Sequence, residues 1–216
     1  MIRGVLLDLD GLMTDTERLF LESWAAVMEE QGYPAHREIV IHCIGMDLQS
    51  IETYVHQALG SDFDYEGILR AAEQRSKSYI AAHGVPVKQG LQALLDGLDQ
   101  RGIPYGVATS SVSFHARERL RLIGVLDRLS GLVTGDMVFR GKPDPEIYRR
   151  AAASLGLPPE DCLALEDSPC GVRSAFSAGC KPVMIPDLQQ PDPEIRKMLV
   201  GCFYSLDQVL SNLDSL

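Results

Sequence analysis

The chain lacks the features that mark membrane and nucleic-acid-binding proteins. No apolar run among its 216 residues approaches the roughly 20 residues that a membrane span needs. Its 20 basic residues are outnumbered by 30 acidic ones, so the formal net charge is −10 and no basic stripe exists to neutralise nucleic-acid phosphates. We therefore expect no membrane and no nucleic-acid partner. An anionic ligand would have to be attracted by local cations rather than by the overall field.

Cysteine is scarce, and its spacing excludes two common kinds of site. The five cysteines are odd in number and widely spaced, and no Cys-x-x-Cys pair occurs. Neither a zinc site nor a disulfide framework has this pattern. No orienting histidine is evident for a catalytic thiol, so reduced, mostly buried cysteines in a cytoplasmic protein are expected. The first strand begins within two or three residues of the start, which predicts that no signal peptide precedes it.

The remaining composition, 45% hydrophobic and 23% charged, is that of an ordinary globular protein. Residues 16–85 show helical spacing of apolar side chains without strand-like alternation, whereas strands alternate with helices from Pro86 onward. Such alternation implies right-handed βαβ crossovers and a parallel sheet. After the first strand, the alternation of strands and helices resumes only at residue 86. We therefore predict a doubly wound α/β domain of residues 1–15 and 86–216, interrupted by an all-helical domain of residues 16–85.

The expected elements follow from apolar runs that end at glycine or proline. In the helical segment we expect a helix from about Thr16 to Gly32, then helices over Ile39–Ile44, Leu48–Leu59 and Tyr65–Ala82. In the α/β segment we expect strands over Val5–Leu7, Tyr105–Thr109, Leu132–Thr134, Leu163–Leu165, Pro182–Ile185 and Phe203–Tyr204. The helices between them are expected over Leu91–Arg101, Ser113–Ile123, Pro145–Leu155 and Cys170–Ala178, and residues 186–193 as a surface loop.

Two carboxylates and a glycine follow the first strand directly. The buried run Val5–Leu7 is succeeded by Asp8, Asp10 and Gly11. Open α/β sheets bind ligands at the carboxyl ends of their strands. Like charges this close are costly unless a cation lies between them, and Mg²⁺ held by one or two carboxylates and a substrate phosphate is the natural candidate. Asp-Gly is also common turn chemistry, so this segment alone leaves both interpretations open.

Polar residues follow three later strands as well. Taken singly, the hydroxyls of Thr109–Ser111 could cap a helix, Lys142 could be solvated, and the acids of Glu166–Asp167 could complement a helix dipole. Because parallel strands share one carboxyl edge, however, these side chains and the first two acids are expected to converge in one crevice. A metal ion and the lysine would balance the carboxylates there, and a phosphate would complete the site.

These residues resemble the four motifs of the haloacid dehalogenase-like hydrolases. The motifs match in order and spacing as Asp8-x-Asp10-Gly11, Thr109, Lys142-Pro143 and Glu166-Asp167-Ser168. Within that superfamily, the opening Asp8–Glu17 and the stretches Gly141–Tyr148 and Leu165–Val172 resemble the beta-phosphoglucomutase-like branch. The resemblance covers essentially the whole chain. It implies a Rossmann-like core with an inserted helical cap.

The resemblance also implies a Mg²⁺-dependent phosphatase that works through an aspartyl-phosphate. Asp8 would be the nucleophile and Asp10 the general acid and then the base. Thr109, the backbone around Ser110 and the Lys142 ammonium would hold the transferring phosphoryl group.

The metal ligands are implied in the same way. Mg²⁺ would bind the carboxylates of Asp8 and Asp167 and the main-chain carbonyl of Asp10, with Glu166 acting through a metal-bound water. True dehalogenases and phosphonate-cleaving relatives lack an acid at the position of Asp10, which disfavours C–halogen and C–P substrates.

The cap is expected to close from hinges near residues 14–16 and 84–88. Arg75 resembles in position a basic cap residue of the mutase that could contact substrate, although a solvated helix arginine explains it equally well. Phe20 stands where the mutase has a histidine, and the loop Gly45–Leu48 lacks the arginine that holds a second phosphate. Both departures favour hydrolysis over mutase chemistry.

The expected substrate is a small phosphorylated metabolite, either a sugar phosphate or a nucleoside-type monophosphate. A beta-phosphoglucomutase-type sugar phosphate mutase is the second hypothesis. A phospho-acceptor signalling domain is the third, since such domains also group acids and a lysine at a sheet edge. The helical insertion and the Glu166–Asp167 pair speak against it. We expect a monomer, with a dimer as the alternative.

Overall fold

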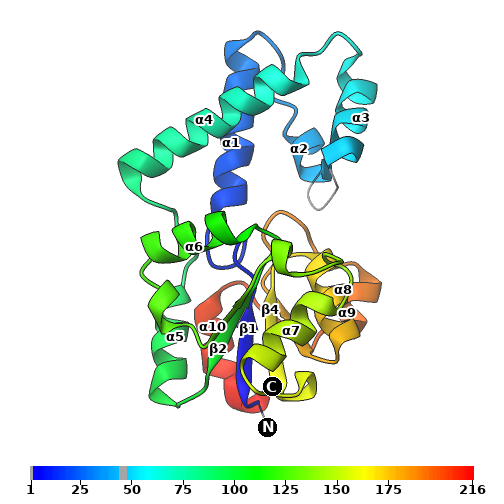
Figure 1. The fold of residues 1–216 in the computed structure, drawn as a ribbon. Helices are drawn as coiled ribbons and strands as arrows, with labels where there is room; N and C mark the ends of the chain where they lie inside the picture. Colours follow the sequence, from blue (N-terminus) through cyan, green and yellow to red (C-terminus); the bar gives the residue numbers. More distant parts are fainter. Residues whose placement is uncertain (1, 44–47) are drawn as a thin grey trace. The chain divides into compact units, whose positions relative to one another are not determined.

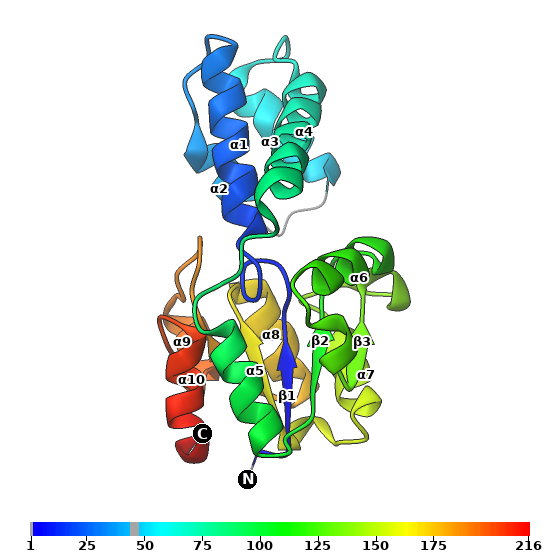
Figure 2. The same cartoon turned by 90° about the vertical axis from the view of Figure 1, so that its left-hand side faces the viewer.

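The computed structural model describes residues 2–43 and 48–216. The chain divides into two compact units, one formed by Met1–Asp15 with Val87–Leu216 and the other by Thr16–Pro86. Each unit has its own hydrophobic core, and Figures 1 and 2 show both units from two sides. Among the described residues, no helix is both long and apolar enough to cross a membrane.

The first unit contains the predicted doubly wound parallel sheet. Among its described residues, six strands pair in the order β3-β2-β1-β4-β5-β6, and every pairing is parallel. The strand order turns back at β1, which is where open α/β sheets have their ligand crevice. The strands are β1 Gly4–Leu7, β2 Tyr105–Ala108, β3 Gly131–Val133, β4 Cys162–Glu166, β5 Lys181–Met184 and β6 Gly201–Cys202.

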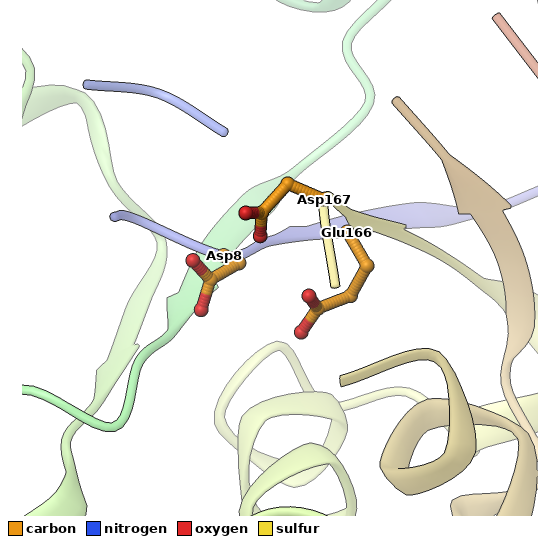
Figure 3. A group of neighbouring side chains, drawn as sticks. All are labelled: Asp8, Glu166 and Asp167. Atoms are coloured by element: carbon orange, nitrogen blue, oxygen red, sulfur yellow. The ribbon is translucent and has the colours of Figure 1, made fainter. Parts of the chain in front are cut away.

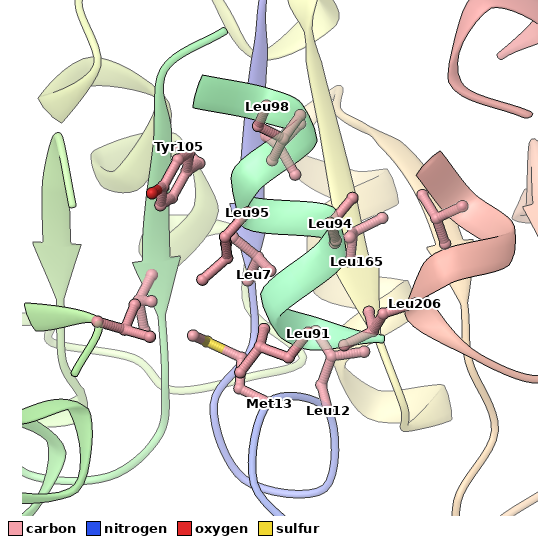
Figure 4. Packing of buried hydrophobic residues seen from close by; sticks show 14 of the residues in the cluster. Leu7, Leu12, Met13, Leu91, Leu94, Leu95, Leu98, Tyr105, Leu165 and Leu206 are labelled. Atoms are coloured by element: carbon pink, nitrogen blue, oxygen red, sulfur yellow. The ribbon is translucent and has the colours of Figure 1, made fainter. Parts of the chain in front are cut away.

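Helices cover both faces of this sheet because alternate strand residues point to opposite sides. On one face, Leu7 and Leu165 pack against leucines of α5 and α10, as Figure 4 shows. On the other face, Leu6 and Ala164 pack against α7 and α8. The helices of this unit are α5 Leu91–Gln100, α6 Ser113–Leu122, α7 Glu146–Ser154, α8 Pro169–Ala178, α9 Pro193–Met198 and α10 Leu206–Asn212.

The last strand lies two residues before the predicted position. Gly201 and Cys202 pair with Val183 and Met184 of β5, so the expected strand at Phe203–Tyr204 is wrong. Aromatic residues favour strands, but register is set by the neighbouring strand rather than by propensity. The Phe203 amide still donates to the Met184 carbonyl (2.9 Å) as the chain leaves the sheet.

Two helices of the α/β unit had no counterpart among the predicted elements. The helix α9 begins after Asp192, whose carboxylate accepts hydrogen bonds from the amides of Glu194 and Ile195 (2.8 Å each). Pro193 follows this N-cap at the first helical position, a start signal that is visible in the sequence. The helix α10 contributes the buried Val209 to the core beside α5. In the loop 186–193, Asp187 pairs with Lys88 (2.9 Å) and its side chain is buried, so that loop is not entirely a surface feature.

The second unit is helical, with α1 and α4 as its principal packed pair. Its core gathers Trp24, Met28 and Ile68, which lie at helical spacing on their elements. Phe20 is half-buried and packs 6.4 Å from the Trp24 ring, between ring centroids. Residues 44–47, on which the prediction about the Gly45–Leu48 loop falls, lie outside the described residues. The helices are α1 Thr16–Glu30, α2 Arg37–Cys43, α3 Leu48–Leu59 and α4 Tyr65–His83.

Candidate active site

The carboxyl edge of the sheet carries the polar residues that follow β1, β2 and β4. Backbone hydrogen bonds continue the strand ladders past the strand ends, from the Asp8 amide to the Leu165 carbonyl (3.1 Å) and from the Thr109 amide to the Val133 carbonyl (3.1 Å). Such bonds fix the backbone of the site residues to a rigid scaffold. The side chains therefore start from defined positions rather than from mobile loops.

Three carboxylates meet at this edge. Asp8, Glu166 and Asp167 each offer one oxygen such that the three oxygens lie within 4.8 Å of one another. Figure 3 shows the three side chains directed toward a common region from β1 and from the end of β4. All three residues are buried, with exposures of 6%, 0% and 6%. The structure thus brings together residues that are more than 150 positions apart in the chain.

Lys142 lies between two of these acids. Its ammonium donates to Asp8 Oδ1 and to Glu166 Oε1, both at 2.5 Å, and the lysine side chain is only 6% exposed. The Tyr148 hydroxyl donates to the same Glu166 oxygen (2.6 Å), and the Lys142 ammonium lies 5.2 Å from the centroid of the Tyr148 ring. The other Glu166 oxygen accepts from the Ser168 hydroxyl (3.2 Å). Both Glu166 oxygens therefore already have hydrogen-bond donors.

Burial and mutual charge shift the acid–base properties of these groups. Burial, reinforced by the charges of Glu166 and Asp10, raises the pKa of Asp8 well above its ordinary value despite the nearby lysine. Burial would lower the pKa of Lys142, but Asp8 and Glu166 together raise it above its ordinary value. Burial and the neighbouring Glu166 also raise the pKa of Tyr148. At neutral pH the lysine is therefore charged and the tyrosine is a hydrogen-bond donor.

The negative charge of the cluster favours the binding of a divalent cation. The three buried carboxylates of Asp8, Glu166 and Asp167 outnumber the ammonium of Lys142, which contacts Asp8 and Glu166. Carboxylate oxygens are the ligands that Mg²⁺ prefers. The chemistry of this donor set therefore fits a divalent cation.

The first turn of α8 lies very close to the Glu166 carboxylate. Ser168 is its N-cap and accepts from the Gly171 amide (3.1 Å), with Pro169 at the first helical position. A Cβ added at Gly171 would lie 1.9 Å from the Glu166 carboxyl carbon. Only glycine allows the helix backbone to approach the carboxylate this closely.

Gly171→Ala is consequently expected to displace Glu166 and to disturb its bond with Lys142. We expect a loss of stability of roughly 1–3 kcal/mol, the usual effect of overpacking, together with lower activity. Thermal unfolding and hydrolysis assays would measure both effects. Gly141→Ala is the matched control, because a Cβ at Gly141 meets no atom within 4 Å. If the two variants had the same stability and the same activity, the close contact between Gly171 and Glu166 would not be what positions Glu166.

Three further predicted site residues, Asp10, Thr109 and Ser110, lie in the segments that follow β1 and β2. The Asp10 carboxylate pairs with Arg119 and accepts from the Ser111 hydroxyl (2.7 Å). Thr109 is buried, and its hydroxyl accepts from the Ser111 amide (3.0 Å), whereas Ser110 is exposed. These contacts hold the segment after β2 beside the acid that follows β1.

Arg75 belongs to the helical unit. It lies on α4, where its guanidinium pairs with Glu30 of α1 (2.6 Å). Its role as a cap contact stays a prediction.

Sequence reasoning missed Arg119 and Tyr148. Tyr148 lies on the face of α7 that packs against the sheet, where an apolar contact was the natural expectation. Arg119 is one of three arginines at alternate positions of α6, the others being Arg117 and Arg121. Nothing in the sequence distinguishes the one that reaches Asp10.

Comparison with known proteins identifies the family. The family model for haloacid dehalogenase-like hydrolases matches residues 5–185, a stretch that contains the entire cluster. The chain belongs to the haloacid dehalogenase-like hydrolases. The family resemblance predicted from the motifs is thereby confirmed.

Individual relatives within this family span most of the chain. Hexitol phosphatase A of Escherichia coli (strain K12) is 34% identical over 187 residues, covering 85% of this chain and 82% of that protein. Beta-phosphoglucomutase of Bacillus subtilis (strain 168) is 28% identical over 184 residues, covering 82% of this chain and 80% of that protein. A solved structure of a HAD family hydrolase from Deinococcus radiodurans R1, with bound phosphate and sodium, has a TM-score of 0.83 and 26% identity, covering 99% of this chain and 96% of that one.

These relatives agree with the narrower assignment made from the motifs. The chain lies in the beta-phosphoglucomutase-like branch of the haloacid dehalogenase-like hydrolases, and its enzyme class is phosphomonoester hydrolase. The fold class and the enzyme class expected from the sequence are both confirmed.

Proposed function

We propose that the protein hydrolyses a small phosphomonoester, a sugar phosphate or a nucleoside-type monophosphate, with Mg²⁺ and through an aspartyl-phosphate on Asp8. The observation that carries the proposal is the buried cluster of Asp8, Glu166 and Asp167 around Lys142, with its excess of negative charge at the carboxyl edge of the sheet. Such a cluster is costly without a cation and is suited to hold one beside a phosphate.

Mg²⁺ would be held by the carboxylates of Asp8 and Asp167 and by the main-chain carbonyl of Asp10, with Glu166 acting through a bound water. When bound, the ion supplies positive charge that offsets the charge of the phosphoryl oxygens. The Lys142 ammonium, which contacts Asp8 Oδ1, supplies further positive charge at the same position.

Asp8 would form the covalent bond to phosphorus, and Asp10 would transfer the protons. An Asp8 oxygen attacks phosphorus, the P–O bond to the leaving group breaks, and the leaving oxygen takes a proton from Asp10. Asp10, now a carboxylate, then takes a proton from water as that water attacks phosphorus. The Asp8–phosphorus bond breaks, and inorganic phosphate and free Asp8 are regenerated. Each proton given by Asp10 is recovered in the second step.

Thr109, the Ser110 backbone and Lys142 would hold the phosphoryl oxygens. Thr109 follows β2 directly, and its backbone is anchored to Val133. Its position at the carboxyl edge, next to the segment that follows β1, supports this role.

Hydrolysis is preferred over mutase chemistry. The beta-phosphoglucomutase of Bacillus subtilis is a relative, so the alternative has support in the family. Phe20, however, has no ionisable group and packs against Trp24 in the core of the helical unit. A phospho-acceptor signalling domain is disfavoured by the relatives, which include hexitol phosphatase A.

A panel of phosphomonoesters, assayed for released phosphate with Mg²⁺ and with EDTA, tests the proposal. We expect phosphate release from hexose and hexitol phosphates or nucleoside monophosphates, only with Mg²⁺, and none from Asp8→Asn. Glucose 1-phosphate should yield inorganic phosphate without an isomerised sugar phosphate, as followed by NMR. Activity in EDTA would contradict the metal requirement, and an isomerised product would favour the mutase.

Three further expectations belong to the same proposal. The substrate is a free metabolite, the protein is cytoplasmic, and it is a monomer rather than a dimer. Light scattering after size-exclusion chromatography would test the last of these.

A further inference from the structure

The carboxylate of Asp10 is held on both of its oxygens by one segment of the α/β unit. Arg119 Nη1 donates to Asp10 Oδ1, and the Ser111 hydroxyl donates to Oδ2 (2.7 Å). Arg119 Nη1 also lies 3.3 Å from the Ser111 hydroxyl oxygen. The side chains of Arg119 and Asp10 are 30% and 18% exposed. The three groups therefore form a partly buried network whose orientation is strongly constrained.

The helix that carries Arg119 is itself anchored to the sheet edge. Asp136, after β3, accepts from the Ser113 amide (2.9 Å) and from the Ser113 hydroxyl (2.9 Å) at the start of α6. The Thr134 hydroxyl donates to the same Asp136 oxygen (2.6 Å). These bonds replace a side-chain N-cap within α6, so the start of the helix cannot shift freely. The guanidinium therefore extends from a fixed position.

The backbone of Asp10 has its own support. Asp10 and Thr14 form an isolated bridge, and the Gly11 amide donates to the Thr14 carbonyl (2.8 Å) with Gly11 in the left-handed region (φ 89°). This turn is made by backbone atoms and needs no contact with α6. Loss of the guanidinium would therefore remove one restraint on the Asp10 side chain while leaving its backbone in place.

We propose that Arg119 is a positioning residue that orients Asp10 for proton transfer to the leaving oxygen. The proposal rests on the proposed function, in which Asp10 acts as the general acid. Arg119 Nη1 and the Ser111 hydroxyl each bind one oxygen of the carboxylate, and together they constrain the carboxylate plane. Arg119 itself exchanges no proton with the substrate.

The nature of the leaving group distinguishes this role from a structural one. When the ester P–O bond breaks, an alkyl alcohol needs a proton on its oxygen, whereas nitrophenolate is stable without one. General acid catalysis contributes roughly 10²–10⁴-fold, and a misplacement of about 1 Å costs about 10²-fold. For Arg119→Met we therefore expect kcat to fall roughly 10–100-fold on alkyl phosphates, and no more than about threefold on p-nitrophenyl phosphate.

Arg117→Met is the matched control, because Arg117 lies on the same helix and is exposed. It should behave like the wild type on both kinds of substrate. Arg119→Lys keeps the charge but loses the planar guanidinium that places Nη1 near both Asp10 Oδ1 and the Ser111 hydroxyl, so its kcat on alkyl phosphates should fall between those of the wild type and Arg119→Met. Methylguanidinium added to Arg119→Ala should restore activity on alkyl phosphates only.

The outcomes separate this inference from the function on which it rests. A wild type that releases no phosphate from either substrate overturns both. An active wild type with equal losses on both substrates, or a rise in KM with unchanged kcat, overturns the role of Arg119 alone. If Arg119→Met does not fold, Arg119→Lys and the methylguanidinium experiment still compare the loss of activity on alkyl phosphates with that on p-nitrophenyl phosphate. A loss confined to alkyl phosphates, together with the rescue, supports the proposal.

Discussion

Asp8→Asn is expected to abolish phosphate release and, at the same time, to raise the melting temperature of the metal-free protein. The loss of activity follows from the proposed nucleophile, since an amide oxygen forms no stable phosphoryl intermediate. Removing a nucleophile commonly costs more than roughly a thousandfold in kcat. Initial-rate assays with Mg²⁺ on the best substrate of the panel would measure this loss.

The gain in stability follows from the direction of the pKa shift. Burial and the charges of Glu166 and Asp10 raise the pKa of Asp8 above the value it has in the unfolded chain. Between these two pKa values the folded state binds more protons than the unfolded state, so its stability falls as the pH rises. At neutral pH, above the pKa of Asp8 in the unfolded chain, burial of this carboxyl group therefore costs stability, and a neutral asparagine removes that cost. Lys142 retains Glu166 as a partner at 2.5 Å.

The pH dependence provides the control for this argument. In EDTA, the difference in melting temperature between Asp8→Asn and wild type should be small near pH 4 and should grow toward neutral pH. Each ~1 kcal/mol corresponds to about 2–4 °C in a chain of this size. Mg²⁺ should raise the melting temperature of the wild type more than that of the variant. A variant that melts below the wild type at pH 7 in EDTA would contradict the charge argument.

The sequence predicted the site best where a residue's position is set by the strand that it ends. Asp8, Thr109 and Glu166 each terminate or follow an apolar run, and parallel pairing brings those ends to one edge. For such residues the strand pattern is sufficient. The same logic fails for the two-residue strand Gly201–Cys202, because so short an element is defined by its pairing partner and not by its own composition.

Contacts that depend on how a helix is rotated could not be predicted. At about 100° per residue, Arg117 and Arg119 lie on opposite sides of the buried stripe through Ala116 and Leu120. The stripe predicts which face of α6 is buried, but it does not indicate which flank faces the crevice. Only the packed structure shows that Arg119 reaches Asp10.

Lys142→Met is the second variant with a large expected effect. It removes an ammonium that contacts both Asp8 and Glu166 and leaves these carboxyl groups buried without it. Removing one partner of a buried ion pair typically costs about 3–5 kcal/mol, which corresponds to a fall in melting temperature of roughly 10 °C for a chain of this size. Activity should be lost as well, because the lysine would no longer balance the charge on the phosphoryl oxygens.

The high pKa of Lys142 defines the pH range of this effect. Because Asp8 and Glu166 raise that pKa above its ordinary value, the stabilisation is complete below about pH 10 and is lost only in more alkaline solution. Titration of the Lys142 ammonium itself therefore adds no pH dependence, across neutral pH, to the difference in melting temperature between wild type and Lys142→Met. Lys197→Met, on the exposed face of α9, is the matched control and should melt like the wild type.

A double variant tests whether charge balance or packing causes the loss. If uncompensated carboxylates destabilise Lys142→Met, adding Asp8→Asn should recover part of the lost stability, and more than it adds to the wild type. Mg²⁺ should likewise raise the melting temperature of Lys142→Met more than that of the wild type, because it supplies the missing positive charge. Additive effects of the two substitutions would instead indicate that the lysine acts by packing alone. In that case the excess negative charge, on which the metal proposal depends, would not be the cause of the lost stability.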